Sequence, residues 1–328
     1  MMCNHAFCSL LLAASLAGLL PAREPPPRPT SFQLYYGKDA AHLAQLARRM
    51  KPGQVVVVDL RVLTNADREA LLRAADRNGA RVLAYLSIGE LHEDDERRFR
   101  DFLKTFVAKS KIPPRFRTLE ALTLERNEQF KSRRIDVLAE AWRAFVLAEA
   151  ERLHGRGVHG LFVDTVDTVD LYIRKKEWSL DRRRESVEAM MSLVRAIKAR
   201  DREKFVLQNG GLNLVGARVF IGDDTGKEIP GLALAESHRN NPDGVLWENA
   251  FARQDEWSRR KEKELHEIQQ SGRATVFALG YKKTLGSADS FFRKCATAGF
   301  VAAWGTSSER LHREPAVGPL ESPPHPKE

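Results

Sequence analysis

The chain has 328 residues, 43% of them hydrophobic, and a formal charge of +9. This length and composition suit one large folded domain and exclude a collagen-like or largely disordered chain. Three cysteines are too few for a disulfide-stapled scaffold, and they cannot form a structural zinc site alone. The basic charge raises the question of nucleic-acid binding, but Lys and Arg are scattered over amphipathic helical patterns, which indicates solvated helix faces.

The N-terminus resembles an export signal. The apolar run over residues 6–20 is shorter than the about 20 residues that a membrane-spanning helix needs. It is typical of the apolar core of a signal peptide, and Ala22 supplies a small residue for cleavage. We therefore expect a signal peptide at 1–22, a secreted or periplasmic protein and no stable membrane insertion. An uncleaved membrane anchor is the alternative.

Proline-rich segments flank the region that we expect to fold. Residues 23–30 read as an extended linker, and residues 313–328 as a disordered tail. The folded domain is then expected at 31–312. Once the signal peptide is removed, Cys295 is the one cysteine left, so no intramolecular disulfide is expected.

Between these limits, strand and helix patterns alternate. Eight short runs rich in apolar residues predict strands at 32–36, 54–60, 81–88, 158–163, 205–208, 244–247, 275–279 and 300–304. Several are almost continuously apolar, as parallel strands covered by helices are. Amphipathic patterns predict helices at 39–50, 65–78, 93–107, 136–154, 181–200, 253–271 and 287–298.

This alternation predicts an α/β protein built as a single-domain (β/α)8 barrel. Eight units are the number that closes such a barrel, and the length matches its typical ~250 residues. An open doubly wound sheet is the rival, but no GxGxxG motif follows the first strand. The alternation of strand and helix patterns is interrupted at two stretches, 108–135 and 210–243. We expect both to be long excursions on the face of the barrel that carries catalytic loops.

Polar and aromatic side chains gather where the predicted strands end. The acids among them are Asp59, Glu90, Asp164, Asp167 and Glu248, accompanied by Asn209 and by the aromatic residues Tyr36, Tyr281 and Trp304. Helix capping accounts for a single acid after a strand, and core packing for a single aromatic residue. Several acids at one rim instead suit glycosidic bond hydrolysis, in which one acid protonates the leaving oxygen and another attacks the sugar or activates water.

Other catalytic motifs do not fit. The segment 222–228 resembles a phosphate-binding loop but is one residue short and lacks Ser or Thr after Lys227. No zincin pair of histidines and no GxSxG motif is present. We therefore expect no cofactor and no metal site.

Four segments resemble one known family: YLSIGE (85–90), GVHGLFVDTVDTVD (157–170), NGG (209–211) and GVLWENAF (244–251). They are similar to the glycoside hydrolase family 114-type, endo-α-1,4-polygalactosaminidase-like barrel proteins. The resemblance implies an exported endo-hydrolase that cuts α-1,4-linked galactosamine polysaccharide, and we expect the protein to be a monomer. It implies Asp164 as nucleophile and Glu248 as general acid/base. The matching positions that would shape sugar subsites are Asp59, Tyr85, Glu90, Asp167 and Asn209.

Two other functions stay open. A non-catalytic polysaccharide-binding protein could retain the same barrel, because a fold does not guarantee an activity. A basic nucleic-acid-associated protein would need affinity that falls steeply with salt, and the export signal argues against it. The basic excursion at 108–135 also leaves an anionic or neutral glycan open as the substrate.

Overall fold

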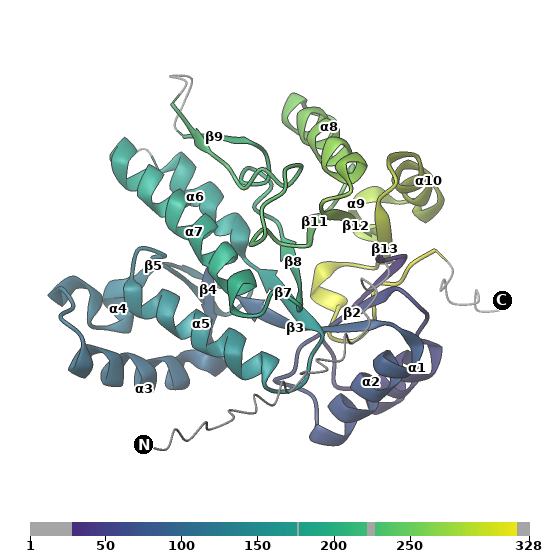
Figure 1. The fold of residues 1–328 in the computed structure, drawn as a ribbon, viewed down its shortest axis with the longest axis horizontal. Helices are drawn as coiled ribbons and strands as arrows, with labels where there is room; N and C mark the ends of the chain where they lie inside the picture. The colour runs from purple at the N-terminus through teal and green to yellow at the C-terminus, as the bar shows by residue number, and fades with distance from the viewer. Residues whose placement is uncertain (1–27, 176, 222–226, 320–328) are drawn as a thin grey trace, which may run out of the picture.

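Eight parallel strands form one sheet that curves into a nearly closed barrel (Figure 1). The computed structural model describes residues 28–175, 177–221 and 227–319. The signal peptide expected at 1–22 and most of the linker expected at 23–30 lie outside the described residues. In their order around the barrel, the strands are β1 (Ser31–Tyr35), β2 (Gln54–Val58), β3 (Arg81–Ser87), β7 (Gly160–Asp164), β8 (Phe205–Asn209), β11 (Gly244–Glu248), β12 (Thr275–Tyr281) and β13 (Val301–Gly305).

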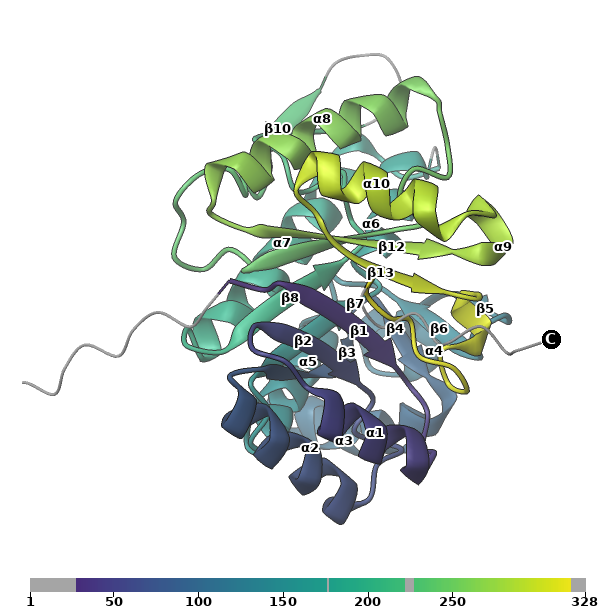
Figure 2. The ribbon, with the colours of Figure 1, turned by 90° about the vertical axis from the view of Figure 1, so that its right-hand side faces the viewer.

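Helices cover the outside of the barrel. Figure 2 shows α1 and α2 on one side of the strands and α8 and α10 on the opposite side. Their ends follow local capping rules: Thr64 accepts a hydrogen bond from the backbone of α2, and Gly79 ends that helix in the left-handed conformation. The longer helices are α1 (Ala40–Arg49), α2 (Asn65–Asn78), α3 (Glu93–Lys109), α5 (Glu140–His154), α7 (Leu180–Arg200), α8 (Glu256–Ser271) and α10 (Ala288–Ala298). The fold is the (β/α)8 barrel that the sequence predicts.

The strands bury both faces, which explains their near-continuous apolar sequences. Alternate residues point into the barrel, where Leu34, Val57, Leu83, Phe162 and Leu279 belong to one interior cluster. The intervening residues point outward and pack against the helices in a second cluster. This period of two decides which side chains reach the opening of the barrel.

Both predicted excursions are present, and each contributes strands to a small antiparallel sheet. After β3, the strands β4 (Glu90–His92), β5 (Thr123–Asn127) and β6 (Ser132–Ile135) form a sheet in the order β4–β6–β5. Between β8 and β11, the chain forms the pair β9 (Arg218–Phe220) and β10 (Glu228–Pro230). The described part of 210–243 contains no helix, as its sequence predicts.

Short helical segments complete the connections between these elements. They are η1 (Pro114–Phe116), α4 (Leu119–Leu122), η2 (Val166–Thr168), α6 (Val169–Arg174), α9 (Lys282–Leu285) and η3 (Ser308–Arg310). Of these, η2 and α6 follow directly on Asp164–Thr165 at the end of β7.

The C-terminal segment differs from the disordered tail expected from residue 313. Ala316 exchanges two backbone hydrogen bonds of 3.1 and 2.9 Å with Leu34 of β1, and Val317 exchanges two of 2.8 and 3.0 Å with Trp304 of β13. The segment therefore fills the seam between the first and last strands. The high proline content of this segment predicts disorder. Ala316 and Val317 are not prolines, however, and they keep the backbone N–H groups that strand pairing needs. Residues 320–328 lie outside the described part.

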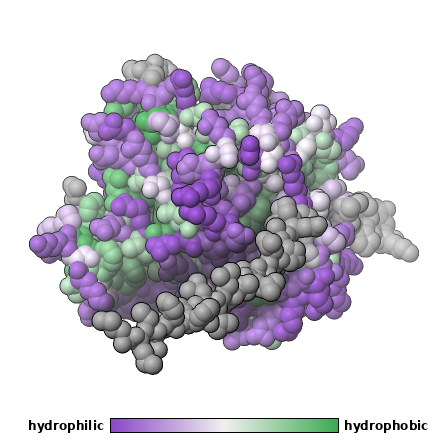
Figure 3. All heavy atoms as spheres, in the orientation of Figure 1, coloured by the Kyte–Doolittle hydropathy of each residue, from purple (hydrophilic) through white to green (hydrophobic). Residues whose placement is uncertain are grey.

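The face of the molecule seen in Figure 3 is mainly hydrophilic. Purple side chains dominate the face in Figure 3, and the hydrophobic areas on it are small and separated. Among the described residues, the exposed large hydrophobic side chains are Val62, Phe130 and Phe220. Across residues 28–175, 177–221 and 227–319, no helix combines the length and the apolar character needed to cross a membrane.

Candidate active site

Strand periodicity brings seven of the predicted residues to one opening. Each lies two positions beyond a residue of the barrel interior, as Asp164 follows Phe162 and Glu248 follows Leu246. Since parallel strands end at the same rim, these side chains converge there. The seven are Tyr36, Asp59, Tyr85, Asp164, Asn209, Glu248 and Tyr281.

Asn209 connects the two predicted catalytic acids. Its Nδ2 atom donates hydrogen bonds to Asp164 Oδ1 at 2.7 Å and to Glu248 Oε2 at 3.3 Å. The two carboxylate oxygens share one donor, so their separation cannot exceed the sum of these distances, about 6 Å, which is below the about 6.5–9.5 Å between the carboxyl groups of inverting glycosidases. Both acids are only partly buried and keep access to solvent. The pair can therefore flank one sugar.

The environment raises the pKa of both acids. For Glu248, burial raises the pKa, the Tyr281 hydrogen bond opposes this, and the charge of Asp164 adds to the rise. For Asp164, burial again raises the pKa, while hydrogen bonds from Asn209 and Tyr85 favour the charged form. Burial thus disfavours the charged form of both acids, and hydrogen bonds from Asn209 and a neighbouring tyrosine oppose it at each, Tyr85 for Asp164 and Tyr281 for Glu248.

Three tyrosines surround this pair. The Tyr281 hydroxyl donates to Glu248 Oε1 at 2.7 Å. Tyr36 and Tyr85 pack edge to face with ring centroids 5.2 Å apart. Burial, and then the charges of Asp164 and Glu248, hold the pKa of Tyr36 well above its usual value. Tyr36 therefore stays protonated and can donate a hydrogen bond at the opening.

Asp59 reaches the opening already ion-paired. Arg61 holds its carboxylate with Nε at 3.0 Å and Nη2 at 2.8 Å. The same guanidinium lies 5.4 Å from the ring centre of Tyr85 and bonds Asp95 at 3.0 Å. Asp59 thus orients Arg61 against Tyr85 more directly than it offers a free carboxylate to a sugar.

The structure does not place Glu90 as a free sugar ligand. Its carboxylate forms an ion pair with Arg134 at 3.0 Å, and it also accepts hydrogen bonds from Asn127 and Ser132. These partners all come from the β5–β6 excursion, which the sequence does not place in space. Glu90 therefore fastens the small sheet to the rim and contributes its negative charge to Asp164 from there.

Trp304 also lies apart from the group. Its position in β13 is outward, between Ala303 and Gly305, and its ring packs against Phe291 of α10 with centroids 5.4 Å apart. Trp304 immediately follows the inward-facing Ala303, and this one-residue difference in strand parity puts its side chain on the opposite face of the strand. Its expected role as a sugar platform has no support in this position.

Asp167 is exposed at the opening of the barrel, its mouth, in the short helical segment η2 after β7. Desolvation, and then repulsion from Asp164, Asp170 and Glu248, raises its pKa to about 7. The carboxyl thus changes charge near neutral pH, next to the acid pair.

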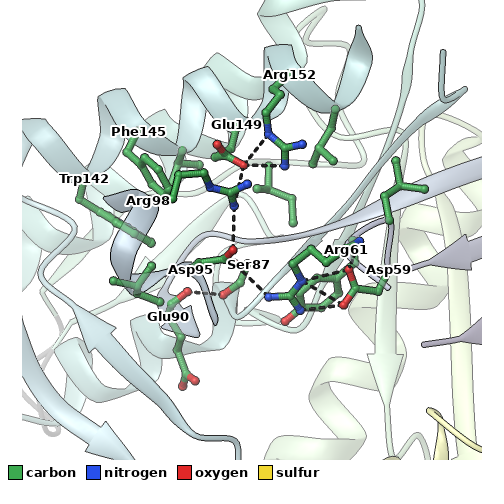
Figure 4. Close-up of a pocket in the computed structure, with 16 residues that line it drawn as sticks. Asp59, Arg61, Ser87, Glu90, Asp95, Arg98, Trp142, Phe145, Glu149 and Arg152 are labelled. Carbon is green, nitrogen blue, oxygen red and sulfur yellow. Dashed lines mark hydrogen bonds and ion pairs between the residues drawn. The ribbon is translucent and has the colours of Figure 1, made fainter. Parts of the chain in front are cut away.

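A separate cavity lies on the flank of the barrel, between the ends of β2 and β3 and the helices α3 and α5 (Figure 4). A chain of ion pairs crosses it, and the Glu90 carboxylate points away from it. Arg61 bonds Asp95, Asp95 bonds Arg98, and Arg98 and Arg152 both bond Glu149. The charges there balance one another. Within the described residues, no group of three or more His, Cys, Asp or Glu side chains could hold a metal ion.

The residues that hold the predicted site residues in place were not themselves predicted from the sequence. Arg61 could have been found, because an aspartate side chain often accepts the backbone N–H two residues on, as Asp59 does from Arg61 at 2.9 Å. Arg134 and Thr165 gave no local signal, because their contacts join segments far apart in sequence.

Two solved structures share this fold. The chain matches the glycoside hydrolase domain of PelA from Pseudomonas aeruginosa with a TM-score of 0.58 and 20% identity, covering 88% of this chain and 98% of that one. It matches Aspergillus fumigatus Ega3, solved in complex with galactosamine, with a TM-score of 0.54 and 15% identity, covering 87% and 94%. No curated protein matches the sequence.

The family model for glycoside hydrolase family GH114 matches residues 17–299, which is most of the chain. The match spans all the converging side chains described above. The chain therefore belongs to glycoside hydrolase family GH114.

Proposed function

We propose that this protein is an exported, endo-acting hydrolase of α-1,4-linked galactosamine polysaccharide, with Asp164 and Glu248 as its carboxylate pair. The observation that carries the proposal is the Asn209 bridge, which holds the two acids at sugar-sized spacing in an open site. Family membership supports the hydrolase activity. The galactosamine bound to the related fold of Ega3 supports the class of sugar.

The reaction we propose has two steps. Glu248 protonates the leaving glycosidic oxygen while Asp164 attacks the anomeric carbon, which forms a covalent glycosyl-enzyme and releases one end of the chain. Glu248, now ionised, takes a proton from water, and that water releases the sugar from Asp164. An oxygen separation of at most about 6 Å suits this retaining course better than the 6.5–9.5 Å of inverting enzymes. Release of the inverted anomer, observed by NMR, would contradict this course.

Asn209 offers a contact for the substrate. Its Nδ2 atom is used by the two acids, and its Oδ1 atom is buried without a hydrogen-bond partner. A buried unpaired acceptor is costly, so a hydroxyl or ammonium group of the sugar would stabilise it on binding.

The charge at the mouth supports a cationic polymer. Asp164, Asp170 and Glu248 lie close enough to Asp167 that their charges raise its pKa, although the whole chain carries +9. A local acidic opening attracts an amino sugar, whereas a uronic-acid polymer would meet repulsion.

The test is the release of new reducing ends from a panel of polymers. We expect cleavage of de-N-acetylated α-1,4-polygalactosamine and little cleavage of its fully N-acetylated form, amylose or polygalacturonate. Asp164→Asn and Glu248→Gln should each lower turnover at least about 1000-fold while circular dichroism stays unchanged. If the wild type binds a polymer of the panel but cuts none, the protein is a non-catalytic glycan binder.

A further inference from the structure

The residues that follow the three central side chains share an unusual backbone conformation. Thr165, Gly210 and Asn249 come directly after Asp164, Asn209 and Glu248, and all three have positive φ. Glycine adopts this conformation freely and asparagine tolerates it. Thr165, at φ 60° and ψ 24°, is β-branched, and such a residue is a genuine outlier there.

The Thr165 hydroxyl occupies a specific place between two strand ends. Its Oγ1 atom accepts the backbone N–H of Gly89 at 2.8 Å and lies 2.9 Å from Ser87 Oγ. Ser87 stands opposite Asp164 in the register of β3 and β7, and its hydroxyl donates to the Glu90 carbonyl. One Thr165 side chain thus connects the end of β3 to the residue after Asp164.

The same turn encloses the Asp164 backbone. The Asp164 carbonyl accepts the N–H of Ile88 at 3.0 Å, and the Thr165 hydroxyl lies 2.6 Å from that carbonyl oxygen. A Cβ added to Gly89 would come within 2.3 Å of the Thr165 carbonyl oxygen, so the two segments are in close contact. Asp164 has no freedom to shift unless these contacts break.

We propose that Thr165 is a positioning residue, which aims the Asp164 carboxylate at the reacting carbon by bonding the turn after β3 and holding a left-handed backbone. This inference rests on the proposed function, since it concerns the orientation of its nucleophile. A misplacement of about 1 Å at a reacting group can cost about 100-fold in rate. The hydroxyl should therefore matter for turnover more than for substrate affinity.

Three variants of Thr165 separate the contribution of the hydroxyl from those of the side-chain shape and the backbone conformation. Thr165→Val keeps the branched shape and loses the hydroxyl. Thr165→Gly loses the hydroxyl but takes the left-handed conformation freely, so backbone strain cannot unfold it. Thr165→Ser keeps the hydroxyl. We expect kcat to fall about 10- to 100-fold in the first two, with KM within about twofold, and to stay within about threefold in the third.

A pH profile adds a second measurement. If Asp164 moves away from Asn209, it loses a hydrogen bond that favours its charged form, so the acidic limb of kcat/KM should move to higher pH in Thr165→Val and Thr165→Gly. The matched control is Thr123→Val, which removes a hydroxyl bonded to the Leu119 carbonyl within the excursion, and it should leave both kcat and the profile unchanged.

The outcomes distinguish this inference from the proposed function. Wild-type protein that releases no reducing ends overturns the proposed function. An active wild type with unchanged kcat in Thr165→Val or Thr165→Gly overturns the role of Thr165 alone. An equal loss in Thr165→Ser overturns it as well, because the hydroxyl would then not be the reason.

Discussion

The Tyr281 hydroxyl donates a 2.7 Å hydrogen bond to Oε1 of Glu248. This bond favours the charged form of the carboxylate and so opposes the rise in the pKa of Glu248 that burial causes. Tyr281 is itself almost fully buried, at 2% exposure, and its phenol remains protonated because burial and then the charge of Glu248 raise its pKa. Tyr281 therefore acts as a fixed donor to the proposed general acid.

Tyr281→Phe should shift the alkaline limb of the pH–rate profile upward. The limb reports the loss of the Glu248 proton, and removal of a donor to the carboxylate raises the pKa of Glu248. A hydrogen bond to a charged group is worth about 1.5–3 kcal/mol, which corresponds to a displacement of about one pH unit or more. The measurement is kcat/KM against pH; a limb that does not move, or that moves to lower pH, would show that Glu248 is not the titrating acid.

Asp167→Asn should make the stability of the fold less dependent on pH. An aspartate ionises near 3.8 in the unfolded chain, and Asp167 ionises at about 7 in the folded one. Between these values the folded state binds more protons, so its stability falls as pH rises through this window. Above pH 7 the variant should gain about 1 kcal/mol, far less than the full shift, since the side chain is exposed.

Thermal melting at pH 4, 6 and 8 measures this effect of Asp167. The difference in Tm between Asp167→Asn and the wild type should be small at pH 4 and largest at pH 8. A Tm difference that is the same at all three values would contradict the raised pKa of Asp167.

Removal of residues 314–328 should destabilise the barrel. The truncation breaks the four backbone hydrogen bonds of Ala316 and Val317 and uncovers the edges of β1 and β13. At about 1 kcal/mol for each bond, a loss of about 4 kcal/mol is expected in urea denaturation. Removal of 320–328 alone is the matched control and should leave the free energy of unfolding unchanged. Equal stability of the two truncated proteins would refute a role for residues 314–319 in the seam.

Lys198, which is buried, and Asp243, which is partly exposed, form an ion pair below the barrel. Lys198 Nζ donates to Asp243 Oδ2 at 2.8 Å and to the carbonyls of Arg202 and Lys204, and Asp243 also accepts the N–H of Val206. Lys198→Met leaves a partly exposed carboxylate and two backbone carbonyls without their cation, and this should cost about 1–3 kcal/mol of unfolding free energy.

Lys283→Met is the control for Lys198→Met. It breaks an exposed pair with Glu309 and should cost less than about 1 kcal/mol. Because the Lys198 pair lies at the end of the strands opposite the acids, kcat should be unchanged in folded Lys198→Met. A selective loss of kcat with normal stability would contradict this assignment.

The sequence by itself determined the barrel and most of the residues at its opening. Strand–helix alternation predicts the eight units, and a strand has only two faces, so the positions of Asp164 and Glu248 two residues beyond interior residues follow from periodicity. By the same rule Trp304, one residue after the inward-facing Ala303, lies on the helix-covered face of β13.

Only the tertiary structure decided which of these side chains are free to contact a substrate. Glu90 looks as free as Asp164 in the sequence, yet Arg134 from a distant hairpin neutralises it, and Arg61 holds Asp59. The tail reads as disordered by composition, yet it fills a seam that exists only once β1 and β13 meet. Ion pairs and strand pairing between remote segments depend on how the chain closes in space, and local sequence does not encode that.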